Sequence, residues 1–202
     1  MNKKTTTILI SIVIFFIIVI GFLIIQTKIT GNIIMAENPQ IKMQTSKGDI
    51  VIELYLKEAP ITVENFLVYV NEGFYDDLIF HRVIPNFMIQ GGGFESDGSE
   101  KENKAPIKLE SNNGLSNEKG TIAMARTYIP NSATSQFFIN LQDNDFLNYA
   151  DGVGKEGYAV FGKVIEGIEI VEAIGMVQTT MKNGMQDWPT EDIKIIKIES
   201  IE

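Results

Sequence analysis

The 202-residue chain contains no cysteine and only one histidine, His81. Without cysteine it cannot form a disulfide, use a thiolate as nucleophile or bind zinc through sulfur. Sites that need several histidine ligands are excluded as well, and we expect neither a metal nor a cofactor. Basic residues are also in the minority, with 17 lysines and arginines against 26 aspartates and glutamates, a net charge of −9. This balance argues against nonspecific nucleic-acid binding, which depends on basic patches.

Residues 8–25 form a long run without charge, ILISIVIFFIIVIGFLII. An apolar run of about 18 residues is just long enough to cross the hydrocarbon core of a membrane as a helix. Lys3 and Lys4 precede it, so the positive-inside rule keeps residues 1–7 in the cytoplasm and places the rest of the chain outside. We therefore expect a single-pass membrane anchor at 8–25, a linker at 26–40 and an extracytoplasmic domain at 41–202.

A cleaved signal peptide is the alternative interpretation of this segment, and it would give a secreted protein. The apolar region of a signal peptide is usually shorter, about 7–15 residues, and ends at a pair of small residues around the cleavage site. The tripeptide Ile34-Met35-Ala36 has a bulky residue where a small one is needed. This pattern favours the uncleaved anchor.

The remaining chain, residues 41–202, has the pattern of one domain with many short strands and two helices. Apolar residues at helical spacing predict helices that begin at Pro60 and near Ile168, whereas the polar, glycine-rich stretch 91–119 is typical of loops. Strands are expected at 41–45, 50–56, 80–90, 120–126, 136–140, 158–163 and 193–201. Such a pattern favours a mainly β fold, an antiparallel barrel with helices at its ends.

Five longer motifs in this domain occur in a fixed order. They are FHRVIPNFMIQGG at 80–92, GTIAMAR at 120–126, SQFFINL at 135–141, DFL at 145–147 and YAVFGKVIEGIEIVEAI at 158–174. Together they resemble the cyclophilin family of peptidyl-prolyl isomerases over nearly all of residues 41–202. The resemblance implies an eight-stranded antiparallel barrel capped by two helices and catalysis of cis/trans isomerisation at Xaa-Pro bonds. The expected substrates are proline-containing polypeptides, with a role in the folding of extracytoplasmic proteins, and the expected state is a monomer.

The resemblance also assigns roles to individual residues, beginning with Arg82 as the catalytic arginine. Phe87, Met88, Phe138 and Leu147 match the wall of the proline pocket, Gln90 and Gln136 its polar positioning groups, and Ala125 and Arg126 a strand edge that faces the substrate. Phe146 and Tyr158 stand where many eukaryotic members carry tryptophan and histidine, as in the bacterial-type branch.

Taken singly, each of these residues has a simpler interpretation. An arginine in a strand is usually solvated or ion-paired, and apolar residues such as Met88 are usually plain core. A serine-histidine hydrolase built on His81 and Ser135 is disfavoured because the chain has no G-x-S-x-G motif, and because His81 and Arg82 are expected on opposite strand faces. A peptide-binding chaperone module with incidental isomerase activity remains the alternative function.

Overall fold

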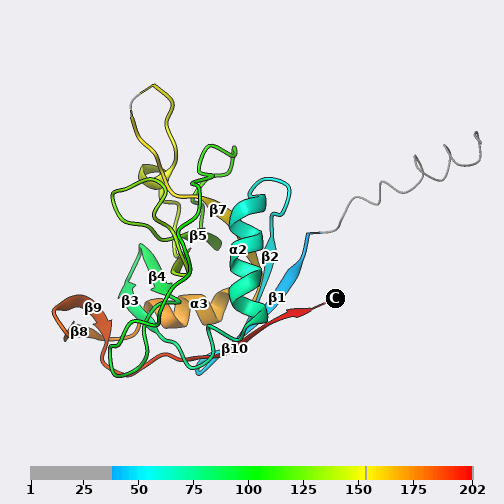
Figure 1. Cartoon of the computed structure of the whole chain (residues 1–202). Helices are drawn as coiled ribbons and strands as arrows, with labels where there is room; N and C mark the ends of the chain where they lie inside the picture. Colours follow the sequence, from blue (N-terminus) through cyan, green and yellow to red (C-terminus); the bar gives the residue numbers. More distant parts are fainter. Residues whose placement is uncertain (1–37, 153, 202) are drawn as a thin grey trace, which may run out of the picture. The chain divides into compact units, whose positions relative to one another are not determined.

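The computed structural model describes residues 38–152 and 154–201 (Figure 1). The expected membrane anchor at 8–25 lies outside the described residues. Within the described ranges, no helix combines the length and the apolar character that crossing a membrane requires. The folded unit begins at Asn38, and its first strand begins at Gln40, one residue before the expected boundary.

Eight antiparallel strands form one curled sheet, so the predicted mainly β fold is confirmed. The strands are β1 (Gln40–Thr45), β2 (Gly48–Leu54), β3 (Phe80–Ile84), β4 (Met88–Gly91), β5 (Thr121–Met124), β6 (Phe137–Asn140), β7 (Val160–Glu166) and β10 (Ile195–Ile201). Their order across the sheet is β10-β1-β2-β7-β5-β6-β4-β3. A bridge between Ile79 and Lys194 connects the two ends of this order, so the sheet curls around an enclosed core.

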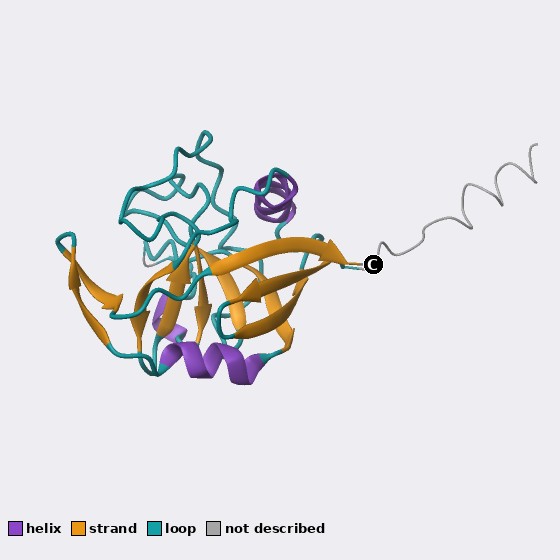
Figure 2. Ribbon diagram, turned by 90° about the horizontal axis from the view of Figure 1, so that it is seen from below, coloured by secondary structure: helices purple, strands orange, loops and turns teal. Residues whose placement is uncertain are grey.

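Two helices lie on either side of the strands, α2 (Pro60–Asn71) and α3 (Ile168–Gly175), as Figure 2 shows. Pro60 occupies the first turn of α2, where its missing N–H costs nothing. The carboxylate of Glu110 accepts hydrogen bonds from the N–H groups of Ile61 (3.2 Å) and Thr62 (2.8 Å). A loop residue thus satisfies helix donors that would otherwise lack partners.

Strands β4, β5 and β6 are buried on both faces, because their side chains alternate between two hydrophobic clusters. Ile89, Ile122 and Ile139 point into the main core. Their neighbours Met88, Ala123 and Phe138 belong to a second, smaller cluster. Side chains of a strand alternate with a period of two, so the same three strands build the core with one face and a second surface with the other.

The structure corrects the prediction of a continuous strand at 80–90. Residues Pro85–Phe87 form a turn between β3 and β4, with Asn86 at φ 56° and the Phe87 N–H bonded to the Ile84 carbonyl at 3.1 Å. Asparagine tolerates this left-handed conformation better than most residues. The chain therefore reverses immediately after Ile84, and the reversal brings Gln90 directly opposite Arg82.

A second hairpin, β8 (Thr179–Lys182) and β9 (Met185–Pro189), was not predicted from the sequence. Its turn is Asn183-Gly184, with both residues at positive φ (52° and 76°). An Asn-Gly pair between two extended segments is the characteristic signal of a type I′ hairpin, so the signal was present. Strand β9 packs beside β3 and reaches the region around Arg82.

Candidate active site

A slot of about 210 Å³ opens on the outer face of β4, β5 and β6. This volume is below the range of about 300–1,000 Å³ that drug-sized ligands need, and it suits one small ring. Nine residues predicted for the site line it: Arg82, Phe87, Met88, Gln90, Ala125, Arg126, Phe138, Leu147 and Tyr158. Of the predicted set, only Gln136 and Phe146 are not among its lining residues.

Cross-strand pairing explains why residues so distant in the sequence meet here. Gln90 lies opposite Arg82 on β3 and opposite Phe138 on β6, and Phe138 in turn lies opposite Ala123 on β5. Directly opposed residues in an antiparallel sheet have side chains about 4.5–5.5 Å apart at Cβ. The register of the strands therefore places the Arg82 cation, the Gln90 amide and the Phe138 ring in one row across the sheet.

Arg82 stands at one end of the slot, and its side chain is 44 % exposed. Its guanidinium makes no hydrogen bond to any residue that the structure describes. The nearest acidic group is Asp187 of β9, whose Oδ2 lies 3.6 Å from the Arg82 Nε. The donors of this arginine are therefore free to meet a ligand in the slot.

Arg126 lies elsewhere on the wall of the same slot and is held in place by backbone carbonyls. Its Nε and Nη2 donate to the Gly157 carbonyl at 2.9 and 2.7 Å, and its Nη1 donates to the Thr127 carbonyl at 2.9 Å. The guanidinium also lies 4.7 Å from the centre of the Tyr158 ring, a cation–π arrangement. Arg126 and Tyr158 thus form a rigid part of the wall.

The floor of the slot is apolar and almost sealed. Met88 is 2 % exposed, Phe138 4 % and Leu147 8 %. Phe138 meets Tyr158 edge to face at 5.6 Å. Phe146, by contrast, is 60 % exposed and stacks on the back of Phe87 at 5.5 Å. The structure therefore places Phe146 as a support for the wall rather than as part of the lining.

Buried amide side chains hold two of these walls. Asn144, fully buried, donates from Nδ2 to the Phe87 carbonyl at 2.9 Å and to Asn140 Oδ1 at 2.8 Å. The main-chain carbonyl of Asn144 accepts from the Leu147 N–H at 2.8 Å, at the end of the 3₁₀ helix Asp145–Leu147. One asparagine thus holds the backbone of two lining residues, Phe87 through its side chain and Leu147 through its main-chain carbonyl.

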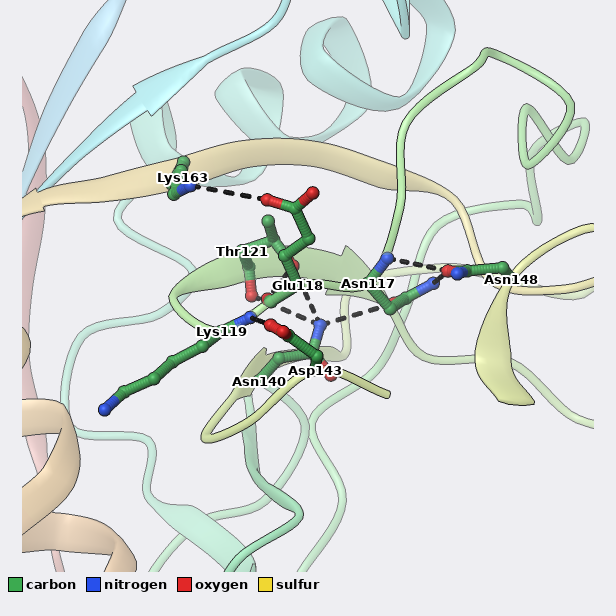
Figure 3. A network of polar contacts seen from close by, with 8 residues as sticks. All are labelled: Asn117, Glu118, Lys119, Thr121, Asn140, Asp143, Asn148 and Lys163. Atoms are coloured by element: carbon green, nitrogen blue, oxygen red, sulfur yellow. Dashed lines mark hydrogen bonds and ion pairs between the residues drawn. The ribbon is translucent and has the colours of Figure 1, made fainter. Parts of the chain in front are cut away.

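Figure 3 shows how this support continues into the barrel. Asn140 donates from Nδ2 to Thr121 Oγ1 at 2.9 Å and to Asn117 Oδ1 at 3.3 Å. Asn148 Oδ1 accepts from both the N–H and the Nδ2 of Asn117, at 2.7 and 3.0 Å. Buried polar groups stabilise a fold only when they are paired, and these satisfied amides connect β5, β6 and the slot. The sequence prediction did not include them, although asparagine recurs in INLQDNDFLN (139–148).

The two predicted glutamines form a chain that leads out of the slot. Gln90 donates from Nε2 to Gln136 Oε1 at 2.9 Å, and Gln136 Nε2 lies 3.3 Å from Glu100 Oε1. A β-carbon on Gly93 would lie 2.6 Å from the Gln136 side chain, so the glycine makes room for this amide. Gln136 therefore orients Gln90 from outside the slot.

His81 is buried, and the structure does not join it to Ser135. The Ser135 hydroxyl lies 2.8 Å from the Gly92 carbonyl oxygen, whereas His81 packs against Phe94 at 4.6 Å. Burial, and then the charge of Arg82, lowers the pKa of His81 to about 4. The expectation that His81 and Arg82 lie on opposite strand faces is wrong. A register shift between Phe80 and Arg82 makes His81 an extra residue, and both side chains line one hollow.

The comparison with protein families decides the identity of the chain. Residues 40–200 match the family model described as cyclophilin-type peptidyl-prolyl cis-trans isomerase. The chain belongs to this cyclophilin family. It is a peptidyl-prolyl cis-trans isomerase, and the two-helix, eight-stranded fold described above is that of the family.

Two bacterial relatives carry the same activity in their names. The chain is 50 % identical over 182 residues to a peptidyl-prolyl cis-trans isomerase of Acinetobacter baylyi, which covers 90 % of this chain and 93 % of the relative. It is 53 % identical over 156 residues to peptidyl-prolyl cis-trans isomerase B of Escherichia coli, with 77 % and 95 % covered. Among solved structures, a Cryptosporidium parvum cyclophilin is similar at a TM-score of 0.68 and 27 % identity, covering 82 % of this chain and 98 % of that one.

Asp187 is another residue near this cyclophilin site that the sequence did not predict. It enters through the β8–β9 hairpin and adopts φ 61°, a conformation that aspartate accepts more readily than most residues. The Asn183-Gly184 turn signals the hairpin, but no local pattern predicts that its second strand places a carboxylate beside Arg82. Only the tertiary packing of β9 against β3 does so.

Proposed function

We propose that Arg82 catalyses prolyl isomerisation by stabilising the twisted amide, while the slot holds the proline ring. Rotation about the peptide bond faces a barrier of about 18–20 kcal/mol because the C–N bond has partial double-bond character. When the amide twists, this resonance is lost and the proline nitrogen regains a lone pair. A guanidinium directed at that lone pair, or at the adjacent carbonyl oxygen, stabilises the twisted state more than the planar one.

The observation that supports this role is the guanidinium of Arg82 at the rim of an apolar slot, with no hydrogen bond to the described residues and one carboxylate at 3.6 Å. Uncatalysed exchange takes tens to hundreds of seconds, so a turnover of about 10³ per second requires roughly 7 kcal/mol of barrier reduction. A preorganised donor supplies about 3–4 kcal/mol. The remainder is assigned to the apolar floor, which fixes the ring while the preceding carbonyl swings.

Proline-containing polypeptides are the proposed substrates. One similar solved structure, 28 % identical with a TM-score of 0.65, is a Cryptosporidium parvum cyclophilin in the presence of the dipeptide Ala-Pro. The slot of this chain has the size and the apolar floor for such a ring. No lining residue is a nucleophile in a hydrolytic arrangement, so the chemistry proceeds without a covalent intermediate.

A protease-coupled assay on an Xaa-Pro peptide tests this mechanism. The wild-type chain should catalyse the exchange, and Arg82→Ala should lower kcat/KM by about 10²-fold or more. The alanine variant should still bind the peptide, as measured by NMR line broadening. If both proteins bind the peptide but Arg82→Ala turns over at the wild-type rate, isomerisation does not depend on this donor and the proposed mechanism is wrong.

The proposed setting is an anchored, extracytoplasmic foldase that acts on exported chains. The uncharged segment 8–25, preceded by Lys3 and Lys4, supports an N-terminal anchor with its start in the cytoplasm. Mass measurement of the membrane-extracted mature chain tests this setting. An intact mass supports the anchor, and loss of the first 25–36 residues replaces it with a secreted enzyme.

A further inference from the structure

A second hollow, of about 590 Å³, lies beside the proline slot on the other side of Arg82. It shares Arg82 and Gln90 with the slot, so the two adjoin. Its other walls come from β9 and from the loop that follows β4, and they include two carboxylates, Glu100 and Asp187. None of the roles assigned above to the proline ring uses this space.

Packing holds the far wall of the hollow in place. Trp188, the residue after Asp187, is fully buried, with its ring 6.1 Å from His81 and 6.0 Å from Phe94. These contacts anchor β9 to the sheet and leave Asp187 at the surface, with its side chain 35 % exposed. The carboxylate is therefore presented by a rigid element rather than by a loose loop.

The charges around the hollow are unbalanced. Among the described residues that line the hollow, Arg82 is the only cation beside Asp187 and Glu100, because burial keeps the pKa of His81 at about 4 and the imidazole neutral near pH 7. Glu100 otherwise accepts only the amide of Gln136 there. The nearby lysines are engaged elsewhere: Lys101 Nζ donates to the Phe74 carbonyl, and Lys182 Nζ donates to the Ser96 carbonyl. When Arg82 turns to a substrate amide, both carboxylates are left for another cation.

A buried polar group in the same wall is also without a partner. His81 is 4 % exposed and lines the hollow, and its Nδ1 makes no hydrogen bond to the residues that the structure describes. Buried polar atoms are nearly always paired in folded proteins. This unpaired nitrogen belongs to a residue that lines the hollow, and the observation is independent of the two carboxylates.

The remaining lining combines two apolar side chains, Phe94 and Met185, with the uncharged amides of Gln90, Gln136 and Gln186. Lysine and arginine carry a long aliphatic stem that packs on apolar surface while the charged head stays at the edge. A glutamate would place its charge beside two carboxylates, and a short apolar side chain would leave them unpaired. The chemistry of the hollow thus matches a long basic side chain.

We propose that this hollow is a second substrate subsite, which takes a lysine or arginine side chain within about three residues of the isomerised proline. The proposal rests on the placement of the proline in the Arg82 slot. The distance follows because the two cavities adjoin at two shared residues and an extended chain advances about 3.3–3.6 Å per residue. The enzyme would accordingly favour basic stretches of its client chains.

A peptide series tests the proposal on the full-length chain in detergent micelles. One Xaa-Pro peptide is made with lysine at each of the three positions on either side of the Xaa-Pro pair, and matched peptides carry methionine or glutamate instead. At one position kcat/KM should be about three- to tenfold higher for lysine than for methionine, and lowest for glutamate. Raising the salt from about 0.05 to 0.5 M should shrink this preference.

Variants separate the subsite from a simple effect on Arg82. In the Asp187→Asn/Glu100→Gln double variant, the lysine-to-methionine ratio should fall below about twofold. Glu102→Gln removes the same charge from an exposed neighbour that does not line the hollow, and it should leave the ratio unchanged.

Three outcomes overturn the subsite. The first is the absence of a lysine preference at every position, and the second is a preference that survives in the double variant. The third is a double variant that loses activity equally on lysine, methionine and glutamate peptides, which would show that Asp187 only positions Arg82. Failure of the Arg82 mechanism gives a different result. In that case Arg82→Ala leaves kcat/KM on the neutral methionine peptide unchanged.

Discussion

The two arginines of the proline slot have opposite surroundings. Arg126 gives three of its N–H groups to backbone carbonyls and lies against the Tyr158 ring. Arg82 makes no hydrogen bond to the described residues and has one carboxylate at 3.6 Å. A guanidinium whose donors are already satisfied can shape a wall but has little left for a substrate. The contrast shows that a residue can line a site without taking part in catalysis. Hydrogen-bond donors that have no partner within the described protein distinguish the catalytic arginine.

The largest expected effect is the difference between the two alanine variants. Arg82→Ala should cost about 3–4 kcal/mol of transition-state stabilisation, roughly 10²-fold or more in kcat/KM. Arg126→Ala should cost less than about tenfold, mostly through a higher KM, because it loosens the wall without removing the donor. Steady-state kinetics on one Xaa-Pro peptide measures both. Equal losses of kcat/KM in the two variants would contradict the assignment of Arg126 to the wall and of Arg82 to catalysis.

The contrast between the arginines explains how far sequence reasoning could reach. The motif around Arg82 and the matching blocks at 120–126, 135–147 and 158–174 predicted nine residues that the structure gathers in one slot. The apolar stretches within 120–126 and 136–140 were enough to expect buried strands. What no motif shows is which arginine is committed to carbonyls, because Gly157 and Thr127 reach Arg126 only through the folded loops.

The missed features share the same origin. Glu110 binds the N-terminus of α2 across 48 positions from Thr62, and Asp187 lies 105 positions after Arg82, with which it pairs. Local patterns predict elements, whereas these contacts depend on how distant loops return to the sheet. The register shift at His81 is a further case, because one extra residue reverses the face on which a side chain lies.

The second largest effect concerns the pH dependence of stability at the Arg82 end. Burial and the charge of Arg82 lower the pKa of His81 from 6.5 to about 4. Between these values the unfolded chain binds a proton and the folded chain does not. The contribution of the neutral His81 to the free energy of unfolding is therefore complete above pH 6.5. It is lost as the pH falls to 4, by up to about 3 kcal/mol. Urea unfolding at a series of pH values measures this loss.

The histidine contribution is isolated by comparison with His81→Phe. Carboxylates also lose their interactions in acid, so the difference between wild type and variant is the relevant quantity. The variant should show a shallower fall between pH 6.5 and 4. In Arg82→Ala the pH range over which stability falls should narrow, because the charge of Arg82 no longer lowers the pKa of His81. Identical slopes for wild type and His81→Phe would contradict a neutral buried imidazole.

A smaller effect is expected from the support beneath the slot. Asn144→Ala leaves the Phe87 carbonyl and Asn140 without their Nδ2 partner, which should cost about 2 kcal/mol of stability. The Phe87 carbonyl loses its bond to the Asn144 side chain, whereas Leu147 keeps its bond to the main-chain carbonyl of residue 144. Because the Phe87 wall then loosens, KM should rise about threefold to tenfold while kcat changes less. Thermal unfolding and peptide kinetics measure the two parts.

Asn65→Ala is the matched control for this support. Asn65 donates from Nδ2 to the Thr134 carbonyl at 2.7 Å and does not line the slot. It should lower stability by about 1 kcal/mol and leave KM unchanged. If both asparagine variants raise KM in proportion to their lost stability, Asn144 has a general structural role and does not position the slot.

The smallest effect is expected at Phe146, which tests the boundary of the site. Its ring is 60 % exposed and touches the slot only by stacking on Phe87. An aromatic pair contributes about 0.5–1.5 kcal/mol beyond its buried area, and exposure places this pair at the low end. Phe146→Ala should therefore reduce kcat/KM by no more than about threefold, and Phe146→Trp should retain activity because the stacking survives. A tenfold or larger loss in the alanine variant would mean that a bound chain covers Phe146, and it would extend the binding surface beyond the two arginines.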